Sequence, residues 1–295
     1  MAEGSSHWDP ADEGGARIRR SWRLTVTAWR LMRKDRTLLL LAAISTVLAF
    51  AGAALIFWVG GYLDHPGRST PRLALIWVIA SFPLTWVSTY LGVALAAAAS
   101  AALDREHLGV RAALAVSQRR LGQITAWSLL ATVVGFILRE IVSRIPWGGK
   151  LASVLVGAAW SLATLFAIPI LALEGCSAIQ CADRSARLFK ERWGEGVTGN
   201  VVIGAWTMVI TIPAGILLGV GISVHRQDPA RGLALLIAGL VALMTVSAVA
   251  SAVRGVFVVA LFKYAREGEV LGGFAESELQ RPLVRKRRGL FGGRD

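Results

Sequence analysis

The chain has 295 residues, of which 55% are hydrophobic and 17% charged, and its mean hydropathy is +0.56. This composition is too apolar for an ordinary soluble protein. The formal net charge is +13, but no zinc-finger spacing, helix-turn-helix or basic strand with interleaved aromatic residues accompanies it. The sequence therefore predicts a membrane protein that does not bind nucleic acid.

The N-terminal part of the chain has a polar tail followed by a basic segment. Residues 1–16 are acidic and rich in glycine, which predicts a disordered tail. In residues 17–36, Trp22, Val26 and Trp29 recur at helical spacing, and arginines occupy another face. This pattern predicts an amphipathic helix that lies on the membrane surface.

Six apolar segments follow, and each is read as a transmembrane helix. Their expected bounds are 37–62, 73–103, 121–138, 151–173, 197–224 and 232–262. At ~1.5 Å per residue, the second segment is longer than the ~30 Å hydrocarbon core. It must therefore tilt, kink at Pro83 or project from the membrane. Pro169 and Pro213 interrupt the fourth and fifth segments.

A charged segment at 176–193 separates the fourth and fifth apolar segments. Its apolar residues recur in steps of three and four, which predicts a helix with one apolar stripe: Ile179, Ala182, Ala186, Phe189 and Trp193. Asp183 and Arg187 stand four residues apart, where opposite charges support a helix weakly. A helix this polar cannot cross a bilayer, so we expect an elbow on the membrane surface. Cys176 and Cys181 match no disulfide framework and are expected to be small apolar fillers.

A charged, helix-compatible segment at 104–120 also precedes a pair of apolar segments. The order of surface helix, span and span thus occurs three times, which indicates an internal repeat. The expected fold is an all-α polytopic membrane protein with six transmembrane helices in three hairpins, each hairpin preceded by a cytoplasmic amphipathic helix. The six-span domain covers 17–274, and a basic cytoplasmic tail covers 275–295.

The distribution of lysine and arginine predicts the orientation in the membrane. The two termini and the connections at 104–120 and 174–196 hold 24 of these residues, and the opposite connections hold 7. Because cytoplasmic loops carry the excess of basic residues, both termini are expected in the cytoplasm. Arg254 falls near the end of the sixth segment, where its side chain can reach the lipid headgroups.

Three stretches resemble a known family: LALEG at 171–175, RSARLFKERWGE at 184–195 and LFKYAREGEVLGGF at 261–274. They resemble an uncharacterised family of bacterial six-span integral membrane proteins, over residues 18–274. More distantly, the chain is similar to the membrane domain fused to some glycerophosphodiester phosphodiesterases. The resemblance implies the architecture and no reaction, because the phosphodiesterase catalytic domain is not in this sequence.

Two sets of residues are candidate sites. The second apolar segment carries a stripe of small or hydroxylated residues, which predicts either a polar groove or, as we favour, a packing seam: Ser81, Thr85, Ser88 and Gly92. Basic residues near the inner ends of the spans are candidates for contacts with anionic lipid headgroups, although for those in the tail we favour a simple topology signal: Arg184, Arg187, Arg285, Lys286, Arg287 and Arg288.

No catalytic pattern stands out in the sequence. Hydrolase, Walker and Rossmann motifs are absent, and the histidines are scattered without metal-ligand spacing. Glu174 is expected to be a solvated turn residue. We therefore expect a protein without enzymatic activity, cofactor or metal, acting as a scaffold, partner subunit or bilayer-organising protein. Its partners would be anionic lipids, other membrane proteins or further copies of itself. The alternative is a permease or exporter for an apolar or lipid-like solute.

Overall fold

The computed structural model describes residues 35–59, 71–143, 149–193, 212–213, 215–225 and 227–267, and every regular element in these ranges is a helix. The labelled helices are α2 (Arg36–Val59), α3 (Pro71–Leu103), α4 (Val110–Arg119), α5 (Leu121–Ser143), α6 (Gly149–Ala163), α7 (Ala167–Leu173), α8 (Ala178–Trp193) and α10 (Pro229–Glu267). A short apolar helix covers Gly215–His225. The expected surface helix at 17–36 and most of the expected span at 197–224 lie outside the described residues.

Five helical stretches in the described part are long and apolar enough to cross a membrane. They are Arg36–Ile56, Ile79–Leu103, Leu121–Ile141, Leu155–Leu173 and Pro229–Arg266. The described part of the chain is therefore all-helical, and its five long apolar helices indicate a multi-pass membrane protein. Helix α5 continues beyond the expected span at 121–138 to Ser143 and includes Arg139 and Glu140.

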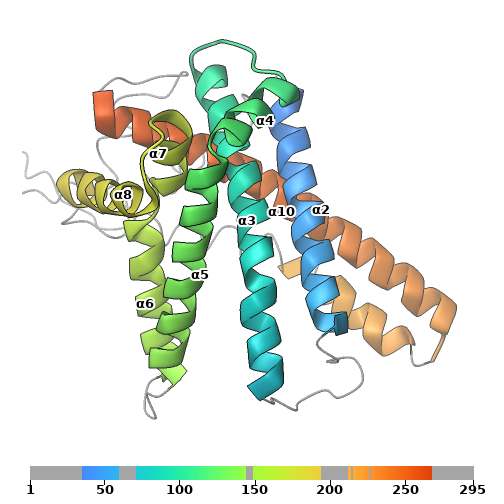
Figure 1. The fold of residues 1–295 in the computed structure, drawn as a ribbon. Coiled ribbons are helices and arrows are strands. Elements are labelled where there is room, and N and C mark those ends of the chain that lie inside the picture. The colour runs from blue at the N-terminus through green and yellow to red at the C-terminus, as the bar shows by residue number, and fades with distance from the viewer. Residues whose placement is uncertain are drawn as a thin grey trace, which may run out of the picture.

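Three helix ends lie together at one end of the molecule. In Figure 1, α2, α3, α5 and α6 run roughly side by side, and α10 crosses behind them obliquely. The start of α2 and the ends of α3 and α10 lie at the upper end in this view. Helix α3 is central, because it contacts α2, α4, α5, α7 and α10.

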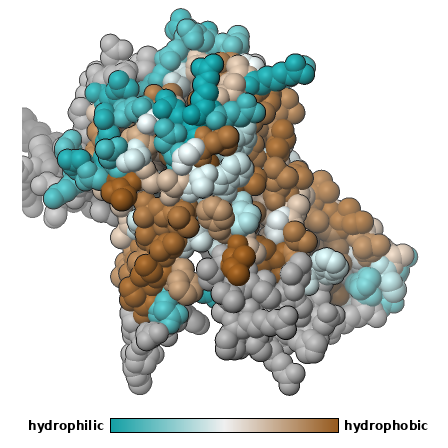
Figure 2. All heavy atoms as spheres, viewed as in Figure 1, coloured by the Kyte–Doolittle hydropathy of each residue, from teal (hydrophilic) through white to brown (hydrophobic). Residues whose placement is uncertain are grey.

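The upper part of the molecule, which we call the cap, comprises residues 35–42, 91–127, 166–191 and 252–266. It has a conventional hydrophobic core in which Phe166, Phe262 and Ile170 are fully buried. Short alanine side chains at 96–99 of α3 are also buried there, which lets neighbouring helices approach its backbone closely. In Figure 2, hydrophilic residues gather over this upper part.

The lower part, which we call the legs, comprises residues 43–59, 71–90, 128–143 and 149–163. Large apolar side chains of the legs point outward, among them Val47, Trp58, Leu129, Phe136 and Leu155. Figure 2 accordingly shows hydrophobic atoms over much of the lower surface. The N-terminal half of α10 has the same character, with Leu233, Ile237 and Val241 exposed. Such surfaces suit a hydrocarbon solvent.

The extra length of α3 lies in the cap. At ~1.5 Å per residue its 33 residues span about 50 Å. Pro83 lies inside the helix and does not end it. Residues 93–100 are all buried by other helices, whereas residues 79–88 are partly or fully exposed. The C-terminal end of α3, which the sequence predicts could project from the membrane, is thus enclosed by the other helices of the cap.

The expected span at 151–173 is two helices. Helix α6 ends at Ala163 and α7 begins at Ala167, so the break precedes Pro169. A proline ring clashes with the carbonyl four residues earlier and provides no N–H, which disfavours regular helix through residue 165. This break redirects the chain from the legs into the cap.

Candidate functional site

The turn after α3 sets the position of two carboxylates. Arg105 has a φ of 63°, the left-handed conformation that commonly ends a helix. The N–H of Arg105 donates to the Ala102 carbonyl (3.3 Å), and the N–H of Glu106 donates to the Ala101 carbonyl (2.9 Å). These two bonds form a Schellman turn. Asp104 and Glu106 are thereby fixed on either side of the turn, at the upper end of the cap.

A polar pocket of about 550 Å³ lies between the end of α3, α4 and the end of α7. Two acids, Asp104 and Glu106, and two arginines, Arg119 and Arg120, contribute its charges; Ala97, Ser100, Ala101, Leu108, Val116, Ala172 and Leu173 line the rest. Helix α4 has 10 residues and is about 15 Å long, so its two ends hold the opposite charges apart. The pocket is the candidate functional site.

A buried lysine ties α10 to this pocket. Lys263 lies inside α10 and is only 8% exposed. Its Nζ donates to the Ser100 carbonyl (3.3 Å) and forms an ion pair with Asp104. A charged group at this burial needs such partners, since desolvation penalises an isolated charge. The pair fixes the C-terminal half of α10 against the end of α3.

The turn between α7 and α8 corrects the expectation that Glu174 is a solvated residue. Its side chain is 14% exposed. The Oε1 atom forms ion pairs with Nη2 of Arg184 (3.0 Å) and Nη1 of Arg266 (3.6 Å). The next residue, Gly175, has a φ of 68°. Arg120 crosses directly over it, since a Cβ at Gly175 would lie 1.2 Å from the Nη1 atom of Arg120. Only glycine permits both features.

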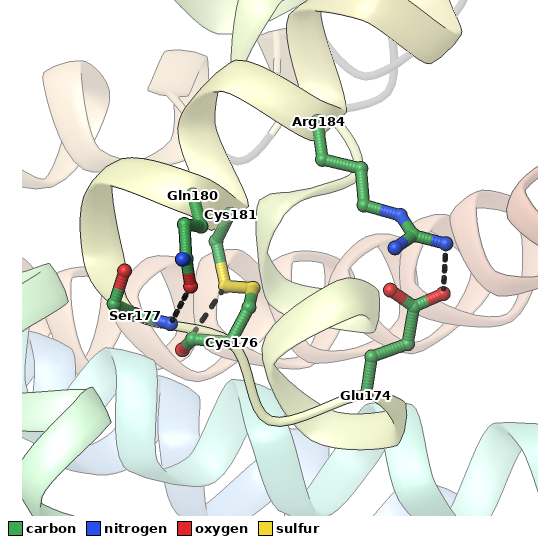
Figure 3. The surroundings of a disulfide bond; sticks show 6 residues. All are labelled: Glu174, Cys176, Ser177, Gln180, Cys181 and Arg184. Carbon is green, nitrogen blue, oxygen red and sulfur yellow. Dashed lines mark hydrogen bonds and ion pairs between the residues drawn. A yellow bond between two sulfur atoms is a disulfide. The ribbon is translucent and has the colours of Figure 1, made fainter.

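The two cysteines form a disulfide with a Cα–Cα distance of 5.7 Å, contrary to the expectation that they are apolar fillers (Figure 3). The expected helix at 176–193 begins too early, because α8 starts at Ala178. Gln180 accepts the N–H of Ser177 through Oε1 (3.2 Å), which is half of a capping box. The spacing Ser-x-x-Gln in the sequence would have predicted this start. Cys176 thus lies in the turn and can reach Cys181.

The buried face of α8 overlaps the expected stripe in part, because Ala182 and Phe189 pack against the core. Ile179 is 74% exposed, whereas Ala178, Cys181 and Ser185 are buried against the cap. Helix α8 contacts α5, α6 and α7, which decides which face is covered. The Ser185 hydroxyl accepts the backbone N–H of Phe166 (3.0 Å), the residue before α7. This bond satisfies one donor freed by the break between α6 and α7.

The candidate residues from the sequence do not gather at one place. Arg184 reaches Glu174, and Arg187 pairs with Asp183 on the exposed side of α8. The cluster at 285–288 lies outside the described residues. On α3, Ser81 and Thr85 are partly buried, Ser88 is exposed, and a Cβ at Gly92 would lie 3.5 Å from Ile168. Their roles as headgroup contacts, groove or packing seam stay predictions.

Arg254 lies at the level of the cap. It is exposed, and a Cβ on its neighbour Gly255 would lie 2.8 Å from Leu95 of α3. Gly255 therefore packs against the buried end of α3. The expected position of Arg254 near a membrane boundary stays a prediction.

The polar groups of this region are mainly charged side chains. Within the described ranges no three His, Cys, Asp or Glu side chains form a group that could hold a metal ion. The pocket of the cap brings two acids and two arginines together among apolar side chains. Such a pocket can bind a ligand that itself carries charge at two points.

Comparison with known proteins gives a family and no reaction. No curated protein and no solved structure matches the chain, so the distant similarity to a phosphodiesterase membrane domain stays an expectation. A family model described as a family of unknown function, DUF6159, matches residues 73–273, from α3 through the end of α10. The matched residues include the pocket, the α7–α8 turn and Lys263. The chain therefore belongs to DUF6159, a family of unknown function.

Proposed function

We propose that the protein is a non-enzymatic membrane scaffold or partner subunit that acts through its cap at the bilayer surface. The observation that carries this proposal is the contrast between a cap with a packed core and charged exterior and legs with an apolar exterior. A rigid, charged platform carried by membrane helices suits recognition of lipids and other membrane proteins. The proposal includes six spans in three hairpins, with a surface helix before each.

The alternative, a permease or exporter, has one feature in its favour. The break between α6 and α7 resembles the discontinuous helices from which transporters build binding sites. However, the protein itself occupies this break, because Phe166 is fully buried and its N–H is bound by Ser185. The pocket of the cap does not include the hydroxylated stripe of α3. These observations favour the scaffold.

A photo-crosslinking residue in the full-length protein in its own membrane tests the proposal. Placed at Lys190, on the exposed side of α8, it should capture a discrete protein, which mass spectrometry then identifies. The matched control at Phe136, on the exposed surface of the legs, should capture lipid. If both positions yield only lipid adducts and reconstituted vesicles show solute flux, the scaffold proposal is wrong and the permease proposal takes its place.

We further propose that the cap faces the cytoplasm, with both termini on that side. The support is the 24-to-7 excess of basic residues in the segments that end at the cap. Reporter fusions at Gly67 and Asp228 should be external, and a fusion after Arg288 internal. The reverse result would contradict the proposal and would place Cys176–Cys181 outside the cell, where disulfides are common.

A further inference from the structure

We propose that the pocket of the cap binds the headgroup of a phospholipid that carries a primary amine. Arg119 and Arg120 would hold the phosphate, and Asp104 and Glu106 would hold the ammonium group. The inference deepens the proposed function, because it names the lipid that the cap binds. It rests on the position of the cap at the bilayer surface.

The order of charges along the molecule matches the order in such a lipid. Arg119 and Arg120 immediately precede Leu121, the first exposed large apolar residue of α5. The exposed apolar series then continues down the leg through Leu129 and Val133. The arginines are therefore at the hydrocarbon side of the pocket, where the phosphate of a glycerophospholipid lies.

The acids are at the other end of the pocket, further from the hydrocarbon. Asp104 and Glu106 follow the last turn of α3, at the opposite end of α4 from the arginines. The amine of a phosphoethanolamine headgroup is likewise further from the acyl chains than the phosphate. One extended headgroup can thus meet both pairs of charges in the correct order.

The charges are available to a ligand. Within the residues that the structure describes, Arg119, Arg120 and Glu106 take part in no ion pair. Asp104 is shared with Lys263 and is 42% exposed, so one of its edges is open to solvent. Arg120 is held in place by its passage over Gly175. Arginine suits phosphate particularly well, because its planar fork can donate two parallel hydrogen bonds.

The same charges select among headgroups. A phosphatidylglycerol headgroup has no cation for the acids and would leave them unpaired beside an anion. A phosphatidylcholine headgroup has a cation but no N–H with which to donate hydrogen bonds to the carboxylates. Inorganic phosphate could bind only the arginines. A primary-amine phospholipid offers an anion to the arginines and a hydrogen-bonding cation to the acids, so it should bind most tightly.

Binding of short-chain lipids to the full-length protein in detergent tests the inference. The probes are dihexanoyl phospholipids with ethanolamine, glycerol and choline headgroups, and inorganic phosphate. We expect the ethanolamine lipid to bind about tenfold more tightly than the others, as one charge-assisted hydrogen bond can provide. Arg119→Gln should weaken it by a similar factor, and Glu106→Gln should abolish its advantage over the glycerol lipid. Arg111→Gln, an exposed arginine of α4 outside the pocket, is the matched control and should change nothing.

Several outcomes would overturn the inference. Equal binding of the ethanolamine and glycerol lipids would reject the role of the acids. An equal effect of Arg111→Gln and Arg119→Gln would indicate diffuse surface attraction, and competition by inorganic phosphate at similar concentration would indicate a simple anion site. If Arg119→Gln does not fold, the headgroup series on the unaltered protein and Glu106→Gln, a change at an exposed residue, still decide the matter. Loss of lipid selectivity with the Lys190 crosslink retained would reject this site and leave the scaffold standing.

Discussion

The cap and the legs differ in where most of their large apolar side chains lie. The core of the cap holds large apolar residues such as Phe166 and Phe262, and its surface carries the charges. In the legs the large apolar residues are exposed, and small hydroxylated residues such as Thr46 and Ser128 are buried. Thr46 satisfies its own hydroxyl by donating to the Ala42 carbonyl (2.8 Å). Large apolar side chains are thus mostly buried in the cap and mostly exposed in the legs of the same chain.

The contrast follows from the solvent on each side. Water drives large apolar groups into the cap, because removing them from water is the main favourable term in folding. Hydrocarbon offers no such drive, so helices in a bilayer associate through close contact of small residues and hydrogen bonds. The same substitution should therefore have different effects in the two regions.

The largest difference is expected for phenylalanine truncation. Phe262→Ala empties a fully buried position in the cap, and such changes typically cost about 3–5 kcal/mol. Phe136 in the leg is 45% exposed, so Phe136→Ala should cost well under half as much. Unfolding by sodium dodecyl sulfate in mixed micelles measures both. Equal losses would show that the two regions share one solvent.

Glycine substitution should change sign between the regions. Gly175→Ala in the cap places a Cβ into Arg120 at a left-handed φ and should destabilise by about 2 kcal/mol. Gly157 of α6 has no described atom near its Cβ position, so Gly157→Ala should stabilise by up to about 1 kcal/mol. Melting temperatures in detergent distinguish the two. A stabilising Gly175→Ala would contradict the geometry of the turn.

Serine substitution sharpens the comparison at a smaller scale. Ser185→Ala leaves the buried N–H of Phe166 without its acceptor and should cost about 1–2 kcal/mol. Ser88 is exposed on the leg portion of α3, so Ser88→Ala should stay within about 0.5 kcal/mol. The same unfolding assay applies. If Ser88→Ala instead abolished solute movement in a folded protein, the permease would become the better proposal.

The smallest effect is expected on the outer face of α8. Arg187 and Asp183 form an ion pair whose side chains are 68% and 55% exposed. Exposed pairs four residues apart contribute about 0.3–0.5 kcal/mol, so Arg187→Ala should be nearly neutral and its effect should vanish in high salt. A loss above 1 kcal/mol at high salt would place this face against a partner.

The sequence by itself determined where the apolar helices are and where the chain turns polar. Both depend on local composition, so the expected segment 73–103 falls within α3. The helical character of α8 and the position of Arg184 on it can also be read from neighbouring residues in the sequence. The first amphipathic helix and the tail at 285–288 lie beyond what the structure describes and stay predictions.

Only the tertiary structure decided which face of each helix is covered and which charges are paired. Lys263 lies 159 residues from Asp104 in the sequence, and no local pattern indicates that the two meet. Helix α8 has apolar residues on more than one face, and contact with α5, α6 and α7 selects Ala178 and Cys181 over Ile179. The pocket has the same origin, because its walls come from α3, α4 and α7. Hydropathy depends on each residue alone, whereas burial and pairing depend on what another part of the chain brings beside it.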